Sequence, residues 1–453
     1  MFGKSTIGRV RMVPAVAVLV ATLAAASCSS DDDDSGSTSE AVAPSQTANT
    51  EAAPDVTDAA PDTTVATPEP TAPDSLSGDT TSDMSAEDQA AVEAAISAGL
   101  QRATAAAPGL EPPALYVGVW DPEKGSYLTA LGEAQPGQAA TVEDHYRIGS
   151  TTKTFTATVI LQLIDEGKLS LDDTIGDLLP DLAAAHPEIA DITIESLLRM
   201  KSGIQDFLNV PDSIVADVAA DPSRVWAPEE LIDAALELEV EPQDTSGYST
   251  TNNIILQLIA ESIEGAPLPE LIQTRLLDPL GMTQSSLPIE DPSLPEPSAA
   301  GNLNDACVGE LIDDGAIGID TDTDLTDWTI SYAQGGGGMT STLADLGLWA
   351  DSNSGNTFLS PDLQTARLVA DSEIQPGVPE IYGLGIFQVG DNWYGHSGEA
   401  IGWQTLVIHD PDTGVSVAFA SNICNGEDLL YWSILNELYP NPTLDDFLTD
   451  QNF

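Results

Sequence analysis

The feature that most constrains this chain is a serine followed by a lysine three residues later, Ser150-Thr151-Thr152-Lys153, where an apolar segment begins. Residues three apart share one face of a helix, so the lysine amine can contact the serine hydroxyl. Phe155, Val159 and Leu163 continue at helical spacing and predict that this helix is buried. Burial lowers the pKa of a lysine, and a neutral amine can accept the serine proton. The segment therefore predicts an activated serine nucleophile on a buried helix.

The same four letters also occur by chance. In a chain with five lysines, a stray Ser-x-x-Lys is expected about one time in three, so other segments must decide.

The N-terminus has the pattern of an export signal. Lys4, Arg9 and Arg11 precede an apolar run from Met12 to Ala26, and Ser27-Cys28 follows. This end is similar to bacterial lipoprotein signals, in which a small residue precedes the lipidated cysteine. We therefore expect a signal over residues 1–27 and a protein held by lipid at Cys28 on the outer face of a bacterial cell membrane. An ordinary cleaved signal is the alternative, and the apolar run is short for a membrane-spanning helix.

Residues 28–84 differ in composition from the rest of the chain. After the cysteine the segment is rich in Ser, Thr, Ala, Pro and Asp and has no Lys, Arg, Phe, Trp or Tyr. Such a segment cannot bury enough apolar surface to fold, so it predicts a disordered acidic tether. The folded body is expected over residues 85–448.

The charge of the chain restricts its partners. It has 73 acidic and 13 basic residues and a formal net charge of −60. This charge excludes nucleic acid as a partner and disfavours anionic membrane surfaces, which leaves the lipid anchor as the expected membrane contact. An acidic, well-solvated surface suited to salt explains the composition without any acidic binding site.

Two cysteines remain if Cys28 carries lipid. Outside the cytoplasm a disulfide between Cys307 and Cys424 is expected, and two separately buried thiols are the alternative. No metal or cofactor is expected, because the four histidines are scattered without ligand spacing. They are His145, His186, His396 and His409.

The order of expected elements indicates the fold class. Ser85 caps a helix over 86–106, two strands follow up to residue 131, and a helical middle runs to about residue 348. The chain then returns to strands before a closing helix. These strands are expected at 382–388, 393–396, 403–409 and 416–420, and the helix at 429–438. The pattern predicts an α+β fold in which both ends of the body build one antiparallel sheet, with flanking helices and an inserted, mainly helical lobe.

Two further segments could complete an acyl-transfer site. Tyr248 precedes a helix in the middle lobe, and a phenol beside an ammonium can lower its pKa enough to shuttle protons. His396-Ser397-Gly398 ends a strand whose backbone could offer an N–H to a developing oxyanion, together with the N–H of Ser150. Core packing of the tyrosine and a satisfied strand histidine are the alternatives.

Taken in order, these segments resemble the serine β-lactamase and penicillin-binding superfamily, nearest to class C β-lactamases, D-alanyl-D-alanine carboxypeptidases and related esterases. The resemblance also rests on three other stretches. These are Ile192 to Gly203, Gly335 to Leu346 and Tyr382-Gly383-Leu384-Gly385.

The resemblance implies a role for each matching residue. Ser150 would be the nucleophile, Lys153 its proton acceptor and Tyr248 the general acid and base. His396, Ser397 and Gly398 would stand where the family has a Lys-Thr-Gly strand motif, as a histidine version does in some carboxypeptidases and esterases. The backbone N–H groups of Ser150 and Glu399 would form the oxyanion hole. Lys201-Ser202-Gly203 has similar letters but precedes the tyrosine and follows a helix, so it is not expected in the site.

Three departures bear on the substrate. Thr250 stands where the family usually has asparagine, and a hydroxyl has a shorter reach than an amide. Glu399 stands where a small or hydroxylated residue is common. No lysine or arginine follows Arg367, so a substrate carboxylate would find no obvious cation near the last motif.

The resulting hypothesis is an anchored serine hydrolase that forms an acyl-enzyme, most like a D-alanyl-D-alanine carboxypeptidase acting on cell-wall peptide. An esterase or β-lactamase of the same fold, acting on a small molecule, is the first alternative. A catalytically silent penicillin-binding-like module is the second.

Overall fold

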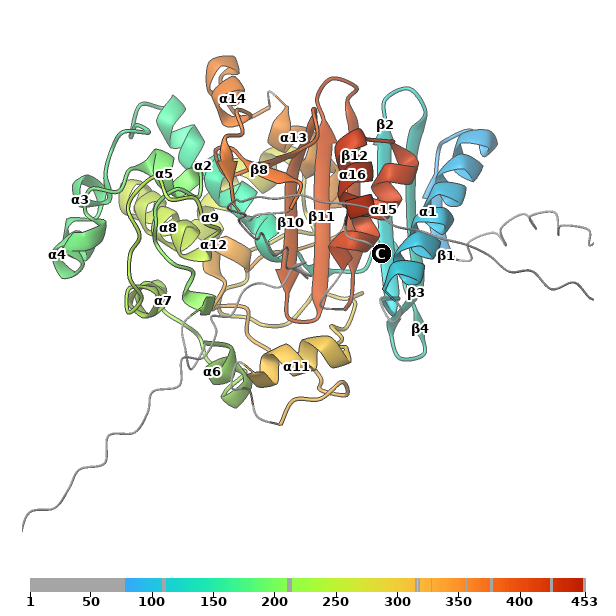
Figure 1. Cartoon of the computed structure of the whole chain (residues 1–453), viewed down its shortest axis with the longest axis horizontal. Helices are drawn as coiled ribbons and strands as arrows, with labels where there is room; N and C mark the ends of the chain where they lie inside the picture. The colour runs from blue at the N-terminus through green and yellow to red at the C-terminus, as the bar shows by residue number, and fades with distance from the viewer. Residues whose placement is uncertain are drawn as a thin grey trace, which may run out of the picture. The chain divides into compact units, whose positions relative to one another are not determined.

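A ten-stranded antiparallel sheet, built from both ends of the described chain, forms the centre of the fold (Figure 1). The computed structural model describes residues 78–107, 111–209, 214–313, 316, 318–326, 328–355, 357–374, 378–423 and 427–450. The strand order is β1-β3-β2-β12-β11-β10-β9-β8-β7, with β4 paired to β3. The strands are β1 (Gly78–Ser82), β2 (Ala114–Asp121), β3 (Gly125–Gln135), β4 (Gln138–Ala139), β7 (Ser372–Glu373), β8 (Glu380–Tyr382), β9 (Phe387–Val389), β10 (Trp393–Ala400), β11 (Trp403–Asp410) and β12 (Val415–Ser421). The predicted α+β fold is confirmed.

Both faces of the sheet are apolar. Alternate residues of a strand point to opposite sides, so the two faces can be compared within one strand. In β12, Val417 and Phe419 belong to one core cluster, whereas Ala418 and Ala420 belong to the other. All seven residues of this strand are buried. The central strands are therefore covered on both faces, which explains their nearly continuous apolar sequence.

Helices cover the two faces. On one face, α1 (Ala86–Ala106) packs against α15 (Glu427–Leu438), followed by α16 (Pro442–Asp450). A Cβ added to Gly99 of α1 would lie 2.6 Å from Ile434 Cα, so this glycine allows the two helices to approach closely. On the other face, α13 (Leu343–Ser354) packs on β2, β11 and β12. Ser85 caps α1 by accepting a hydrogen bond from Asp88 N–H, as the sequence predicts.

The helical lobe is inserted between β5 (Tyr146–Arg147) and β6 (Thr340–Ser341), which pair with each other. Its core includes α2 (Thr152–Asp165), α8 (Thr250–Glu264) and α12 (Gln334–Gly337), which contact one another. The other helices are α3 (Ile175–Leu178), α4 (Pro180–Ala185), α5 (Ile194–Leu198), α6 (Ile214–Ala220), α7 (Pro228–Ala235), α9 (Leu268–Ile272), α10 (Asp278–Leu280) and α11 (Asp305–Asp313), with α14 (Pro361–Arg367) after β6. Helix α2 contacts α8 and α12 of the lobe and also β10 of the sheet.

The structure corrects two expected boundaries. Gly78–Ser82, assigned to the tether from its composition, forms β1 and pairs with β3 through residues such as Thr80 opposite Thr129. The strand expected at 382–388 is two strands, β8 and β9, with a turn between them. Gly385 in this turn has a φ of 68°, and a Cβ there would lie 2.1 Å from Ala157 Cβ of α2. The glycines of this motif thus serve a tight turn against the nucleophile helix.

The expected targeting segment, residues 1–27, lies outside the described residues, as do Cys28 and most of the tether. Within the described ranges, no helix is long and apolar enough to cross a membrane. Cys307 is buried in α11 and disulfide-bonded, whereas Cys424 lies outside the described residues, so this pairing stays a prediction.

Candidate active site

Ser150 lies in η1 (Gly149–Thr151), the single turn that leads into α2. Gly149 has a φ of 49°, and a Cβ there would lie 2.4 Å from Glu399 O. A Cβ at Gly398 would lie 2.0 Å from Ile148 O. Only glycine permits such close approaches, so the two glycines hold the nucleophile turn against the end of β10.

Lys153 is fully buried one helical turn after Ser150. Its Nζ lies 2.9 Å from Ser150 Oγ, 3.2 Å from Thr250 Oγ1 and 2.8 Å from Gly336 O. None of these three partners is a carboxylate. Burial lowers the pKa of Lys153 to about 7, and the charge of Asp206 acts in the opposite direction. Near neutral pH, much of this lysine is therefore an uncharged amine whose lone pair can face the serine hydroxyl.

Thr250 and Asp206 connect the start of α8 to this lysine. The Thr250 N–H donates to Asp206 Oδ2 at 2.7 Å, and the Leu208 N–H donates to Asp206 Oδ1 at 3.1 Å. Both side chains are buried. Thr250 directs its hydroxyl to the Lys153 amine. The threonine therefore provides a polar partner for the lysine.

Tyr248 lies over the same lysine. Its ring centroid is 4.8 Å from Lys153 Nζ, and its ring meets that of Tyr382 edge-on at 6.4 Å. Burial raises its pKa well above the usual value, and a hydrogen bond with Ser150 only partly opposes this. The expectation that a neighbouring ammonium lowers the pKa of this phenol was wrong, because desolvation by burial has the largest effect and nearby acidic charges act in the same direction. Tyr248 is a protonated phenol that can donate a hydrogen bond at the site.

His396 is buried in β10 with both ring nitrogens engaged. Nε2 lies 2.9 Å from the Tyr382 hydroxyl, and Nδ1 makes a short contact with Ser397 O. Burial and the charge of Lys153 lower its pKa to about 3, so the imidazole is neutral. A neutral ring donates from only one nitrogen, so Nδ1–H donates to the carbonyl and Nε2 accepts from the phenol. In this arrangement the histidine orients the strand and carries no positive charge.

The end of β10 lies beside the nucleophile through the backbone around Gly398. Thr405 Oγ1 donates to Ile148 O at 2.9 Å and lies 3.0 Å from Thr151 Oγ1. Thr151 Oγ1 also donates to His396 O at 3.3 Å. These bonds fix the strand against η1, where the N–H groups of Ser150 and Glu399 are expected to face one oxyanion. Ser397 is partly exposed and Glu399 is exposed at this edge.

The structure thus brings together the predicted residues Ser150, Lys153, Tyr248 and Thr250, with β10 alongside. Lys201 does not take part, since its Nζ pairs with Asp371 at 3.1 Å. Sequence reasoning missed Asp206 and gave Tyr382 no role. Asp206 follows Ser202-Gly203 within three residues, and Tyr382 is the first residue of the Tyr-Gly-Leu-Gly segment. Their positions in or next to these motifs are the sequence signal that could have indicated them.

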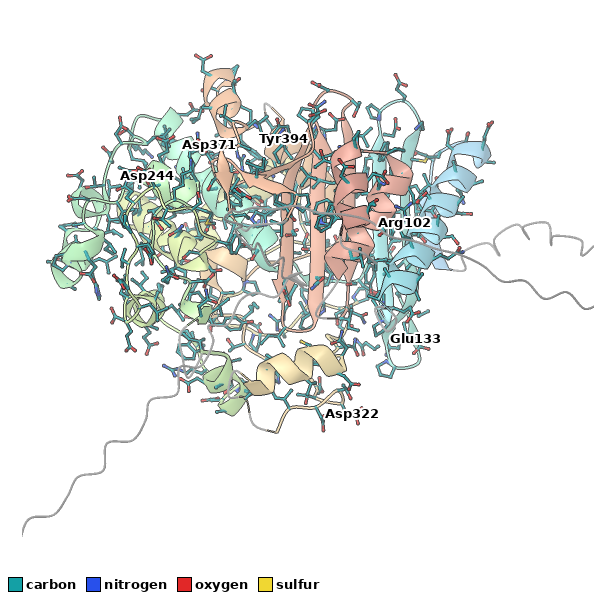
Figure 2. The ribbon with its side chains drawn as sticks, in the orientation of Figure 1. Arg102, Glu133, Asp244, Asp322, Asp371 and Tyr394 are labelled. Carbon is teal, nitrogen blue, oxygen red and sulfur yellow. The ribbon has the colours of Figure 1, made fainter. Side chains whose placement is uncertain are left out.

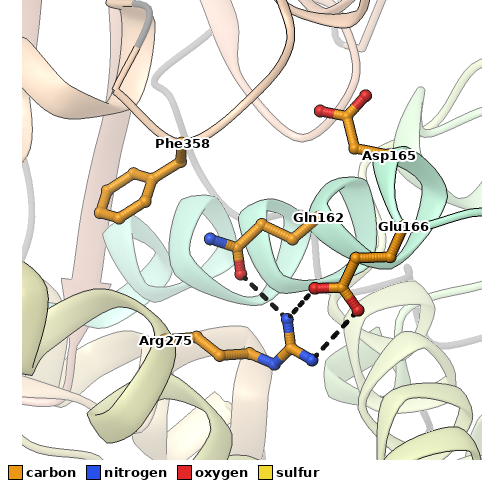
Figure 3. A pocket seen from close by; sticks show the side chains of 5 residues that line it. All are labelled: Gln162, Asp165, Glu166, Arg275 and Phe358. Atoms are coloured by element: carbon orange, nitrogen blue, oxygen red, sulfur yellow. Dashed lines mark hydrogen bonds and ion pairs between the residues drawn. The ribbon is translucent and has the colours of Figure 1, made fainter.

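A polar pocket of about 360 Å³ lies at the other end of α2 (Figure 3). Gln162, Asp165, Glu166, Arg275 and Phe358 line it. It is at the C-terminal end of α2, whereas Ser150 precedes the N-terminal end, so it is separate from the serine and lysine. Among the described residues, no group of His, Cys, Asp and Glu side chains has the arrangement of a metal site.

Comparison with known proteins identifies the family. A family model described as Beta-lactamase matches residues 48–433. Penicillin-binding protein 4 of Amycolatopsis lactamdurans is 31% identical over 178 residues, covering 39% of this chain and 43% of that protein. The D-aminopeptidase of Brucella anthropi is 26% identical over 319 residues, covering 68% of this chain and 55% of that protein. The chain thus spans about half the length of these curated relatives.

Solved structures match this chain over a larger share of their own length than the curated relatives do. A D-stereospecific amidohydrolase from Streptomyces sp. is 26% identical with a TM-score of 0.64, covering 75% of this chain and 98% of that one. The D-amino acid amidase of Ochrobactrum anthropi SV3, 22% identical with a TM-score of 0.62, covers 80% of this chain and 99% of that one, and shares the fold. The chain therefore belongs to the beta-lactamase family and has the fold of these proteins.

Proposed function

We propose that the protein hydrolyses small amides or peptides through an acyl-enzyme on Ser150, with Lys153 as its base. The observation that carries the proposal is the 2.9 Å contact between Lys153 Nζ and Ser150 Oγ, combined with burial that lowers the lysine pKa to about 7. A neutral amine has two N–H donors and one lone pair. Gly336 O and Thr250 Oγ1 can accept the two donors, which leaves the lone pair for the Ser150 proton.

In the proposed reaction, Lys153 takes the proton as Ser150 Oγ bonds to the substrate carbonyl carbon. The negative charge on the carbonyl oxygen is stabilised by the backbone N–H groups of Ser150 and Glu399. The leaving amine or alcohol departs with a proton from the Tyr248 phenol, which recovers one from the Lys153 ammonium. A water molecule then attacks the acyl-enzyme, and the same groups return the proton to Ser150 Oγ.

The substrate class is proposed from two sources. The names of the D-aminopeptidase and D-stereospecific amidohydrolase support an amide bond next to a D-configured residue. Penicillin-binding protein 4 supports the second candidate, a D-alanyl-D-alanine carboxypeptidase of cell-wall peptide. The first candidate is preferred because no basic residue follows Arg367 to hold the carboxylate of a C-terminal D-alanine. Anchoring through Cys28 at the outer face of a bacterial membrane remains part of this proposal.

Covalent labelling tests the nucleophile. Intact-mass measurement after incubation with a fluorophosphonate should show one adduct, located on Ser150 by peptide mapping. Ser150→Ala should abolish both the adduct and the hydrolysis of D-alanine p-nitroanilide while retaining the melting temperature. Ser170→Ala, at an exposed serine after α2, is the matched control and should keep both. A full adduct or normal turnover in Ser150→Ala would reject the assignment, and a folded wild type that takes no label would indicate a silent binding module.

A further inference from the structure

Every lysine and arginine of the described ranges is already engaged within the protein. Seven form ion pairs with carboxylates, and Figure 2 labels two participants, Arg102 and Asp371. The seven are Arg102, Lys124, Lys168, Arg199, Lys201, Arg224 and Arg275. The other three, Arg147, Lys153 and Arg367, are at most 2% exposed.

The two buried arginines cannot present their charge to a substrate. Arg147 donates from Nη2 to Pro292 O and Trp328 O, both at 2.7 Å, and its remaining Nη1 is itself inaccessible. Arg367 donates to Asn353 O at 2.8 Å and to Asn353 Oδ1 at 2.7 Å. Lys153 is partly neutral and His396 is uncharged. The basic residues of the described ranges therefore offer no accessible cation to a substrate carboxylate beside Ser150.

An exposed glutamate belongs to the strand end that contacts the nucleophile turn. Glu399 lies in β10 one residue after Gly398, and its backbone is the nearest neighbour of a Cβ built on Gly149. Its charge contributes to the raised pKa of both Tyr248 and Tyr332, although burial is the larger cause for each. The charge of this side chain therefore acts on Tyr248, whose ring lies over Lys153. A cation there would be favoured, and a second anion would be repelled.

We propose that Glu399 determines specificity by selecting substrates with an ammonium group next to the scissile carbonyl. The inference rests on the proposed function and deepens it, since it names the charge of the substrate. It is the reverse of what a substrate ending in a free carboxylate requires. The ammonium can belong to the acyl part, as in an amino-acid amide, or to the leaving group, as in an amino-alcohol ester.

Isosteric pairs that differ only in charge test this selection. For the leaving-group side we would compare acetylcholine with 3,3-dimethylbutyl acetate, and for the acyl side D-alanine p-nitroanilide with D-lactate p-nitroanilide, at pH 7 and low salt. The corresponding phosphorothiolates, with trimethylammonioethyl or 3,3-dimethylbutyl leaving groups, report the same preference through the rate of Ser150 phosphorylation without turnover. The readout is the ratio of the charged to the neutral kcat/KM or rate constant. A general loss of activity cancels in this ratio.

Glu399→Gln should lower the ratio about tenfold for the pair whose ammonium lies beside this residue, and that pair identifies the side. The matched control is Glu123→Gln, which removes the same charge from the exposed β2–β3 turn. This turn is at the opposite end of the strands, since Trp120 pairs with Ser416 whereas Gln404, opposite Glu399, pairs with Ser421. The control should keep the wild-type ratio. Added salt should narrow the wild-type preference by screening.

Three results would overturn the inference. The first is an unchanged ratio in Glu399→Gln, and the second is an equal fall in both variants, which would assign the preference to the overall acidic charge. The third is a wild-type ratio that favours the neutral partner in both pairs. In each case Ser150 would still be labelled, so the proposed function would stand. If Ser150 is not labelled by any probe, the proposed function and this inference fail together.

Discussion

The two ends of α2 each have a lysine, and the two lysines are in opposite states. Lys153, in the first turn, is fully buried and contacts a hydroxyl of Ser150, a hydroxyl of Thr250 and a backbone carbonyl. Lys168, just beyond the last turn, is 41% exposed and pairs with Glu166 at 2.8 Å and Glu264 at 2.6 Å. Burial lowers the pKa of Lys153 to about 7, whereas the hydrogen bonds with Glu166 and Glu264 raise the pKa of Lys168.

The difference shows what converts a lysine into a base. Burial favours the neutral amine, whereas a carboxylate partner favours the charged ammonium. A lysine that acts as a base therefore needs burial without a carboxylate in direct contact. The carboxylate whose charge acts on Lys153 belongs to Asp206, and its oxygens accept backbone N–H groups of Thr250 and Leu208. The acid therefore influences the lysine pKa through its charge, while its own hydrogen bonds go to the backbone.

The largest expected effect separates the two lysines by the same substitution. Lys153→Arg should lower kcat/KM by about a thousandfold or more, because arginine keeps its proton and cannot serve as a base. Lys168→Arg should stay within about twofold of the wild type, since arginine can keep both ion pairs. Both variants would be assayed with the same neutral ester after their melting temperatures are compared. Near-normal activity in a folded Lys153→Arg would place the base elsewhere.

The second prediction concerns the pH at which Lys153 becomes active. The neutral amine is the active form, so kcat/KM should rise with pH through an apparent pKa of about 7. Asp206→Asn removes a charge that raises the lysine pKa, so the acid limb should move to lower pH by about half a unit to one unit. Asparagine keeps an acceptor oxygen for the Thr250 N–H, which protects the fold. A limb that stays in place, or moves to higher pH, would show that Asp206 has only a structural role.

The comparison also explains which parts of the molecule could be predicted from sequence. The spacing of Ser150 and Lys153 and the cap of α1 are local signals, and the structure has the contact and the cap where they were expected. The state of Tyr248 depends on residues from β10 and the β8–β9 region, and its raised pKa follows from burial that no local pattern records. The strand β1 looks like tether by composition, and only its pairing with β3 reveals it. What sequence missed is therefore mainly tertiary: desolvation, edge pairing and the buried Asp206.

The smallest expected effect lies at the exposed end of α2. Lys168 joins Glu166, Glu264 and Arg275 in an ion-pair network, in which Arg275 lies 2.7 Å from Glu166 and 2.8 Å from Glu264. Exposed pairs of this kind are screened by solvent, and Arg275 remains to hold both carboxylates when Lys168 is lost. Lys168→Met should therefore change the melting temperature by at most about 2 °C at low salt, and about 0.5 M NaCl should remove even this difference. Calorimetry of the two proteins at both salt concentrations, with kcat/KM measured in parallel, checks the expectation. A tenfold loss of kcat/KM in this variant would mean that the charged end of the helix controls the position of Ser150 and Lys153, and the two ends could then no longer be treated as independent.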